Sequence, residues 1–221
     1  MLISLRRKFV FIANLKCAST AIETRLRAMA EIALVESRFG KHLPLSMMEQ
    51  RFGWVFQQVP RQDFIIFGVL RDPIQYMVSL FNSHSDNKFK DNERLYTGEM
   101  DFDIFLDKWC TANRGQVVPQ HTRFLRDDGT IGANFIISYE KISEGWRQLA
   151  SLIGAANLQA LPMVNVSNQR VRAEDLSSRQ LDWISRQFDG DYRFMDFCDR
   201  RLTRDDQHSW TQPADTAGLV A

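Results

Sequence analysis

The chain has 221 residues, of which 44% are hydrophobic and 25% are charged, and its formal net charge is +1. This composition excludes a disordered or fibrous chain, and the near-neutral charge gives no overall attraction to nucleic acid or to a membrane surface. We therefore expect one α/β domain over residues 1–204 and a loose C-terminal tail over 205–221, with any anion-binding site confined to a local cluster.

The three cysteines, Cys17, Cys110 and Cys198, are odd in number and far apart. This spacing fits neither a disulfide framework nor a zinc site and favours a reducing compartment. The four histidines are not spaced as metal ligands. No apolar run approaches the roughly 20 residues that span a bilayer. We therefore expect a cytoplasmic protein with no membrane span, no nucleic-acid partner and no metal.

Short apolar runs alternate with stretches of helical periodicity along the chain. Residues 8–14 (KFVFIAN) are typical of a strand buried on both faces, and the apolar spacing after them predicts a helix over residues 19–38. The pattern recurs with a strand over 63–70 and a helix over 73–81, because Pro73 suits the first turn of a helix. A third strand is predicted over 134–139, and further helices at about 45–52, 101–109, 143–154, 177–188 and 192–201.

This alternation predicts an α/β fold, a three-layer parallel sheet flanked by helices and joined by right-handed crossovers. In such sheets ligands bind beyond the carboxyl ends of the strands. The site is therefore expected just after Asn14, Leu70 and Ser138. Residues 82–100 are polar and without clear period, which indicates a surface loop or a partly helical flap, with a lid as one interpretation.

The first motif lies between the first predicted strand and helix and reads Lys16, Cys17, Ala18, Ser19, Thr20. A helix N-terminus with unpaired N–H groups, a lysine and two hydroxyls is suited to hold a phosphate. Ser19 or Thr20 as a simple helix cap is the alternative interpretation. The segment is not a Walker motif, since the lysine precedes the small residues and no glycine is present, and this counts against a P-loop kinase.

The second motif follows the second predicted strand and reads Arg71-Asp72-Pro73, with Ser79 in the helix after it. Arginine at the carboxyl end of a strand can bind a phosphate through two N–H groups, and Ser79 lies about two turns into the helix. Alone, an arginine before a helix is more often a salt-bridge partner, so the hypothesis depends on the pairing of the two motifs.

The two motifs resemble those of a known family. ANLKCASTAIETRL is similar to the 5′-phosphosulfate loop of sulfotransferases that use 3′-phosphoadenosine-5′-phosphosulfate (PAPS), and VLRDPIQYMVSLF to their 3′-phosphate segment. The segments GKHLPLSMMEQRF, ISYEKISEGWRQL, LPMVNVSNQ and DYRFMDF resemble further parts of the carbohydrate branch, which includes heparan-sulfate 2-O- and chondroitin-type enzymes. Leu15 departs from the family's usual proline, and Cys17-Ala18 from its Thr-Gly or Gly-Gly.

The resemblance implies a P-loop nucleoside-triphosphate-hydrolase-like sulfotransferase fold, PAPS as co-substrate without metal, and a hydroxylated acceptor, a carbohydrate or glycoconjugate. It implies that Lys16 both binds nucleotide and stabilises the leaving group. Arg170 and Arg172 are expected to close over the 3′-phosphate or the acceptor, although solvated arginines explain them equally well. The nucleotide-binding residues expected are Lys16, Cys17, Ala18, Ser19, Thr20, Arg71, Ser79, Arg170 and Arg172.

His42, in the Lys-His segment, is the candidate general base, because a neutral imidazole suits removal of the acceptor's proton. His84 and His121 are its rivals, and Glu140 is expected to orient backbone or arginines or to act in acid–base chemistry. Two other functions stay open: a P-loop small-molecule kinase, and a non-catalytic nucleotide-binding protein of the same fold.

Overall fold

A computed structural model describes residues 1–35, 40–164 and 168–201 of the chain. Within these residues five strands form one sheet in the order β3-β1-β2-β4-β5. The predicted tail over 205–221 and the C-terminal end of the first predicted helix lie outside the described residues. The strands are β1 (Leu2–Ser4), β2 (Phe9–Ile12), β3 (Ile32–Ala33), β4 (Ile65–Leu70) and β5 (Phe135–Ser138).

The three predicted strands are confirmed as β2, β4 and β5, and they run parallel to one another. Phe11 pairs with Phe67 across β2 and β4, and Gly68 pairs with Ile136 across β4 and β5. The carboxyl ends of these strands therefore meet at one edge of the sheet, as the site prediction requires.

The sheet is mixed rather than wholly parallel, because β1 and β3 add an antiparallel pair beside β2. The predicted helix over 19–38 is correspondingly too long: α1 ends at Leu26, a 3₁₀ turn follows, and Ile32 pairs with Ile3 of β1. Apolar residues that continue a helical period thus belong to a short edge strand, and pairing with β1 decides their conformation.

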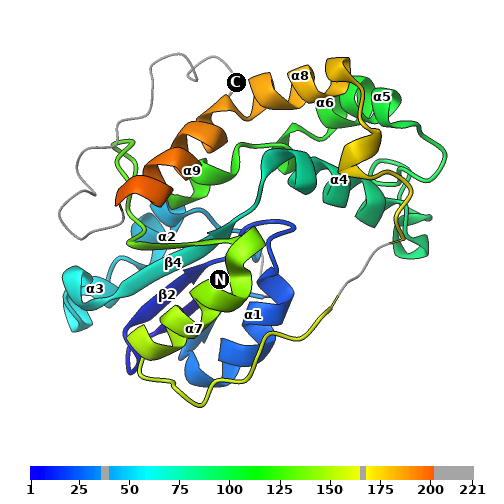
Figure 1. Cartoon of the computed structure of the whole chain (residues 1–221). Coiled ribbons are helices and arrows are strands. Elements are labelled where there is room, and N and C mark those ends of the chain that lie inside the picture. Colours follow the sequence, from blue (N-terminus) through cyan, green and yellow to red (C-terminus); the bar gives the residue numbers. More distant parts are fainter. Residues whose placement is uncertain (36–39, 165–167, 202–221) are drawn as a thin grey trace.

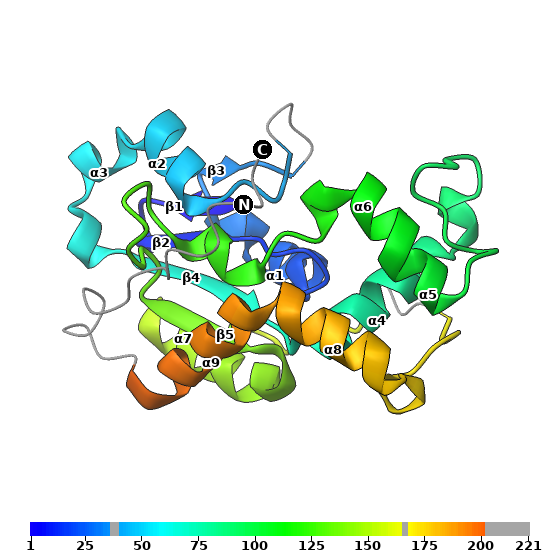
Figure 2. The same cartoon turned by 90° about the horizontal axis from the view of Figure 1, so that it is seen from above.

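Helices cover both faces of the sheet and form a third group beside it (Figures 1 and 2). Figure 1 shows α1 and α7 on one face, with α2 and α9 on the other. The third group surrounds α4, which continues from β4. The helices are α1 (Ser19–Leu26), α2 (Leu45–Phe52), α3 (Val55–Gln58), α4 (Pro73–His84), α5 (Phe102–Ile104), α6 (Cys110–Ala112), α7 (Ile142–Leu152), α8 (Ser178–Gln187) and α9 (Asp189–Arg201).

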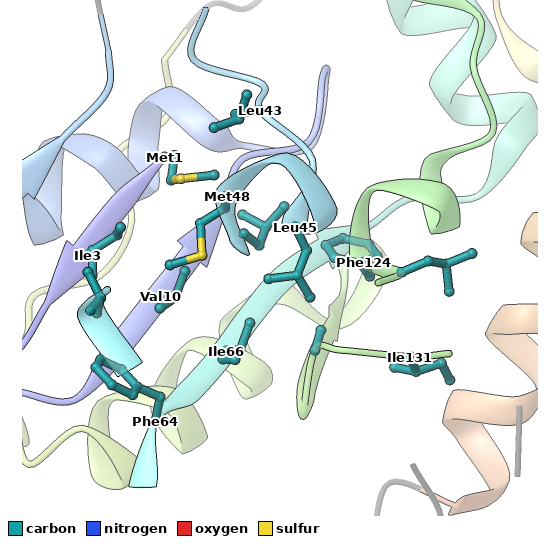
Figure 3. Packing of buried hydrophobic residues seen from close by; sticks show 14 of the residues in the cluster. Met1, Ile3, Val10, Leu43, Leu45, Met48, Phe64, Ile66, Phe124 and Ile131 are labelled. Atoms are coloured by element: carbon teal, nitrogen blue, oxygen red, sulfur yellow. The ribbon is translucent and has the colours of Figure 1, made fainter. Parts of the chain in front are cut away.

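Three apolar clusters correspond to these three groups. One face of the sheet packs Val10 and Ile66 against Leu45 and Met48 of α2 (Figure 3). The other face packs its own side chains against α1 and α7. The third cluster joins α4 to α5, α6 and α8. Apolar burial on both faces of the sheet holds the strand ends, and the loops that leave them, in fixed positions.

Residues 82–100 start inside α4, which extends to His84, and continue through a 3₁₀ turn over Asn87–Phe89. The later part is tied to its surroundings, since Thr97 is buried and donates from Oγ1 to the Phe81 carbonyl over 2.9 Å. Nowhere in the described ranges is a helix both long and apolar enough to cross a membrane. The same ranges hold no cluster of three or more His, Cys, Asp or Glu side chains suited to a metal ion.

Candidate active site

The loop between β2 and α1 has an unusual backbone. Lys16 and Ala18 both have positive φ, 56° and 55°, although neither is glycine. Such conformations cost an L-residue about 1–2 kcal/mol and concentrate at functional sites. Ala18 is the N-cap of α1 and no side chain caps the helix, so Ser19 and Thr20 do not act as caps. The backbone N–H groups of the loop therefore lie together with the uncapped N-terminus of α1. Such an arrangement binds anions.

The two sequence motifs come together at this loop. Arg71, directly after β4, donates from Nη1 to the Lys16 carbonyl over 3.2 Å. Its guanidinium lies 4.2 Å over the Tyr139 ring, just after β5. Arg71 Nε is buried and has no hydrogen-bond partner among the described residues. A buried guanidinium N–H without a partner is costly, which fits a site completed by an anionic ligand.

The electrostatics of the loop favour a polyanion. Burial, together with the charges of Lys88 and Arg71, lowers the pKa of Lys16 to about 8. Within the described ranges neither Lys16 nor Arg71 has a carboxylate ion-pair partner. Several cations without a counter-ion repel one another, so binding of a phosphate or sulfate here relieves that repulsion.

The start of α4 is fixed by two carboxylates. Asp72 caps the helix by accepting from Gln75 N over 2.9 Å, and Asp72 N donates to Glu140 Oε1 over 3.0 Å. Glu140 also accepts from Ser138 Oγ over 2.8 Å, so it links the ends of β4 and β5. Ser79 is half-buried further along α4 and makes no hydrogen bond through its hydroxyl to the described residues.

His42 lies beside the end of β2. Its Nδ1 is 2.9 Å from the carbonyl of Ala13, which leads into the Lys16 loop. Burial lowers the pKa of His42 to about 4, with a smaller contribution in the same direction from Arg123. The neutral ring therefore carries its proton on Nδ1 and donates it to Ala13, which leaves a lone pair on Nε2.

The two rival histidines have other surroundings. His84 is buried, donates from Nδ1 to the Leu80 carbonyl over 2.9 Å, and stacks on Phe89 with 4.4 Å between the ring centroids. His121 is buried and its Nδ1 lies 2.6 Å from Asp191 Oδ1. Of the three rings, His42 is the one held by the backbone that leads directly into the loop.

Arg170 and Arg172 follow residues 165–167, which lie outside the described ranges. The guanidinium of Arg170 donates to the carbonyls of Thr97, over 2.8 Å, and Met100, over 3.0 Å, and lies over the Phe81 ring. Arg172 is exposed and lies 3.9 Å from Glu174. Within the described ranges no hydrogen bond or ion pair joins either arginine to Lys16 or Arg71.

Several residues at the site were missed by sequence reasoning. Gln120 contacts both Cys17 and the backbone of Arg71, and Arg123 donates to the His42 carbonyl. The charge of Lys88, within residues 82–100, lowers the pKa of Lys16. Sequence reasoning identified His121 as a rival base but not Gln120 beside it, because a buried amide carries no pattern that periodicity can detect.

A family model described as "Sulfotransferase family" matches residues 1–197 of the chain. The comparison with curated proteins gives no match, and neither does the comparison with solved structures. The match covers most of the chain and includes both motifs.

The fold and site thus define an α/β enzyme of group transfer with the P-loop-like architecture of sulfotransferases. The chain belongs to the sulfotransferase family. It is a sulfotransferase, an enzyme that moves a sulfuryl group to a hydroxyl acceptor.

Proposed function

We propose that this sulfotransferase takes its sulfuryl group from PAPS and transfers it to a hydroxyl of a carbohydrate. The observation that carries the proposal is the contact between Arg71 Nη1 and the Lys16 carbonyl, 3.2 Å, in a cationic site without a carboxylate partner among the described residues. A nucleotide with phosphate groups at both its 3′ and 5′ positions is a ligand that two adjacent cationic loops can bind together.

Each loop has its own part in binding. Lys16, the backbone from Cys17 to Ala18, and the hydroxyls of Ser19 and Thr20 bind the 5′-phosphosulfate. Arg71 binds the 3′-phosphate, and its Nε, which has no hydrogen-bond partner in the described part of the chain, supplies one of the donors. Ser79 is the proposed second donor to that phosphate.

Arg170 and Arg172 differ in how many of their guanidinium N–H groups already donate hydrogen bonds. Arg170 already donates to two carbonyls, so it acts on the nucleotide through the segment it holds. Arg172 is exposed, with a long contact to Glu174, and is the proposed direct contact to the 3′-phosphate or to acidic groups of the acceptor.

The reaction is an in-line displacement at sulfur. The acceptor oxygen forms a bond to sulfur while the bond from sulfur to the 5′-phosphate oxygen breaks, and the electron pair stays on that phosphate oxygen. Lys16 and the loop N–H groups stabilise this charge, because fixed donors at a developing anion lower the barrier. The acceptor's hydroxyl proton passes to Nε2 of His42.

His42 suits the role of base because burial keeps its ring neutral. Its pKa of about 4 means that the lone pair on Nε2 is available at neutral pH. The negative nucleotide bound beside it raises this pKa, which makes His42 a stronger base in the complex than in the free enzyme. The hydrogen bond to Ala13 fixes the tautomer while the proton is transferred.

The carbohydrate class of acceptor rests on sequence resemblance to the heparan-sulfate 2-O- and chondroitin-type branch. Labelled sulfate transfer from PAPS to polysaccharides, lipooligosaccharides and small hydroxylated metabolites tests it directly. We expect label on a polysaccharide or glycoconjugate, and label only on small metabolites would contradict the acceptor class.

Calorimetry with adenosine 3′,5′-bisphosphate and with ATP and magnesium separates the remaining functions. A sulfotransferase binds the bisphosphate in preference, whereas a P-loop kinase prefers ATP with magnesium. Tight binding of the bisphosphate without transfer to any acceptor is the outcome expected of a non-catalytic protein of this fold.

A further inference from the structure

A buried side-chain amide joins the two loops of the site. Gln120, in the 3₁₀ turn η6 (Gln120–Phe124), is 1% exposed. Its Oε1 accepts from Arg71 N over 3.1 Å, and its Nε2 donates to the Arg71 carbonyl over 2.8 Å. The amide thus pairs with both backbone groups of Arg71, as a neighbouring strand would, at the point where β4 ends.

The same amide reaches the other loop. The thiol of Cys17 lies 3.2 Å from Gln120 Oε1 and donates to it. Burial raises the pKa of this thiol, so it keeps its proton and stays a donor. Gln120 therefore contacts Cys17 between the two left-handed residues of the loop and Arg71 at the end of β4, through one planar group.

Asp191 of α9 holds the amide in place. Its Oδ2 accepts from Gln120 N over 2.9 Å and lies 3.4 Å from Gln120 Nε2. Its Oδ1 accepts from His121 N over 2.8 Å. Asp191 and Gln120 are both almost fully buried. The orientation of the amide follows from its partners, since the Arg71 N–H can only donate and the Arg71 carbonyl can only accept.

We propose that Gln120 is a positioning residue, which sets the distance and orientation between the 5′-phosphosulfate loop and the 3′-phosphate arginine. The inference rests on the proposed PAPS function. Gln120 does not touch the nucleotide; it acts through the backbone of Arg71 and the thiol of Cys17. Because the spacing between the two anion sites is fixed before the nucleotide binds, less conformational entropy is lost on binding.

The two hydrogen bonds between the Gln120 amide and the Arg71 backbone give a specific test. A glutamic acid at position 120 has the same shape as glutamine only while it is protonated, when its O–H can donate to the Arg71 carbonyl. Burial and the carboxylates of Asp191 and Glu140 favour a pKa above the usual value of about 4.3 for such a group. The cations Arg71 and Arg123 act in the opposite direction, as they do on the neighbouring Cys17. Once ionised, it can no longer donate and repels the Arg71 carbonyl.

The experiment measures the dissociation constant of adenosine 3′,5′-bisphosphate by calorimetry between about pH 5.5 and 8.5. The proteins are wild type, Gln120→Glu, Gln120→Met and the control Gln116→Met. Gln116 lies four positions earlier in the chain, and its side chain makes no hydrogen bond to the described residues. Each variant is compared with wild type at the same pH, which removes the titration of the ligand itself.

We expect Gln120→Glu to bind within about 3-fold of wild type at the lowest pH and about 10- to 50-fold more weakly at the highest. Gln120→Met should bind about 10- to 50-fold more weakly at every pH, because it lacks both hydrogen bonds to Arg71. Gln116→Met should match wild type. Because an ionised carboxylate at this buried position can also destabilise the fold, circular dichroism at each pH checks that every variant stays folded.

The outcomes separate the two proposals. If wild type does not bind the bisphosphate, the proposed function fails. If wild type binds it and both Gln120 variants bind equally well at all pH values, the function stands and the positioning role is wrong. If Gln120→Met does not fold, the result for Gln120→Glu is decisive. Bisphosphate binding by Gln120→Glu that is weaker by the same factor at every pH would contradict the positioning role of Gln120.

Discussion

The pKa of Lys16, and so the pH range in which it is charged, depends on its surroundings in the site. Burial and the neighbouring cations lower its pKa to about 8 in the free enzyme, and a bound phosphate raises it again. The binding energy from this charge is therefore fully present below about pH 8 and is lost as the pH rises, when binding must first add a proton. The bisphosphate is fully ionised in this range and does not itself titrate, since phosphate's second pKa is about 6.

We predict that the dissociation constant of adenosine 3′,5′-bisphosphate rises up to about 10-fold per pH unit above pH 8. The variant Lys16→Arg should lose this dependence, since arginine stays protonated throughout. Titration calorimetry at several pH values provides the comparison. An equal rise in wild type and Lys16→Arg would assign the dependence to another group.

The proposed role of His42 predicts a separation between chemistry and binding. His42→Ala should lower kcat by about 10²- to 10⁴-fold, because the general base is lost. The affinity for the bisphosphate should change by less than about 2-fold, since the ring contacts the Ala13 backbone and not the loop cations. Steady-state kinetics and calorimetry measure the two quantities. Turnover at the wild-type level would move the base to another residue.

At the residue scale, the sequence predicted the position of the site better than its contents. The two motifs were located because each follows a buried strand, and parallel strands bring their carboxyl ends together. Gln120, Asp191 and Arg123 were not identified, because their role depends on burial and on partners distant in the chain. No local pattern distinguishes a buried glutamine from a solvated one.

At the scale of elements, the start of α1 is built on strained backbone. Ala18 has a φ of 55°, where its Cβ is crowded, and the helix starts without a side-chain cap. Glycine relieves this strain of about 1–2 kcal/mol but adds freedom to the unfolded chain worth about 0.4–1 kcal/mol. The loop thus has alanine in a left-handed conformation at a position where the family resemblance leads one to expect glycine.

We predict that Ala18→Gly raises the free energy of unfolding by about 0.5–1 kcal/mol. The matched control is Ala28→Gly, an exposed alanine in the 3₁₀ turn after α1 whose φ is not positive. It should lower the free energy of unfolding by up to about 1 kcal/mol. Urea unfolding of the three proteins gives both values. A loss of stability in Ala18→Gly would mean that the left-handed conformation is not strained.

Local sequence patterns predicted some elements of the fold and not others. Strands β2, β4 and β5 are apolar runs buried on both faces, and helices such as α8 carry a complete capping box, so local signals identify them. Strand β3 has only two residues and takes its conformation from β1, which precedes it by about 30 residues. Such short edge strands are decided by pairing and not by periodicity.

At the scale of the whole molecule, the chain between α7 and α8 connects the sheet to the helical group around α4 (Figure 1). Its first part is fastened to α1, since Arg25 donates to the Ala160 carbonyl over 2.9 Å. Its last part is fastened to α4, since Asn82 Oδ1 accepts from Arg170 N and Val171 N. The connection therefore links the two helices that begin at the candidate site.

Arg170 extends this link to residues 82–100. By holding the carbonyls of Thr97 and Met100, it keeps the segment that carries Lys88 against α4. We predict that Arg170→Met accelerates hydrogen exchange of the amides at residues 97 and 100 by about 10- to 100-fold, because charged hydrogen bonds contribute about 1.5–3 kcal/mol each. Exchange in β2 and β4 should not change, since the sheet has its own apolar clusters.

Arg172→Met is the matched control for this prediction, because Arg172 is exposed and its guanidinium makes a long, 3.9 Å contact to Glu174. It should leave exchange at residues 97 and 100 as in wild type, since exposed ion pairs contribute little. If Arg172 instead contacts the nucleotide, as proposed, the same variant weakens binding of the bisphosphate while exchange stays constant. Unchanged exchange in Arg170→Met, together with weaker nucleotide binding, would contradict a structural role for Arg170 and place it in direct contact with the ligand.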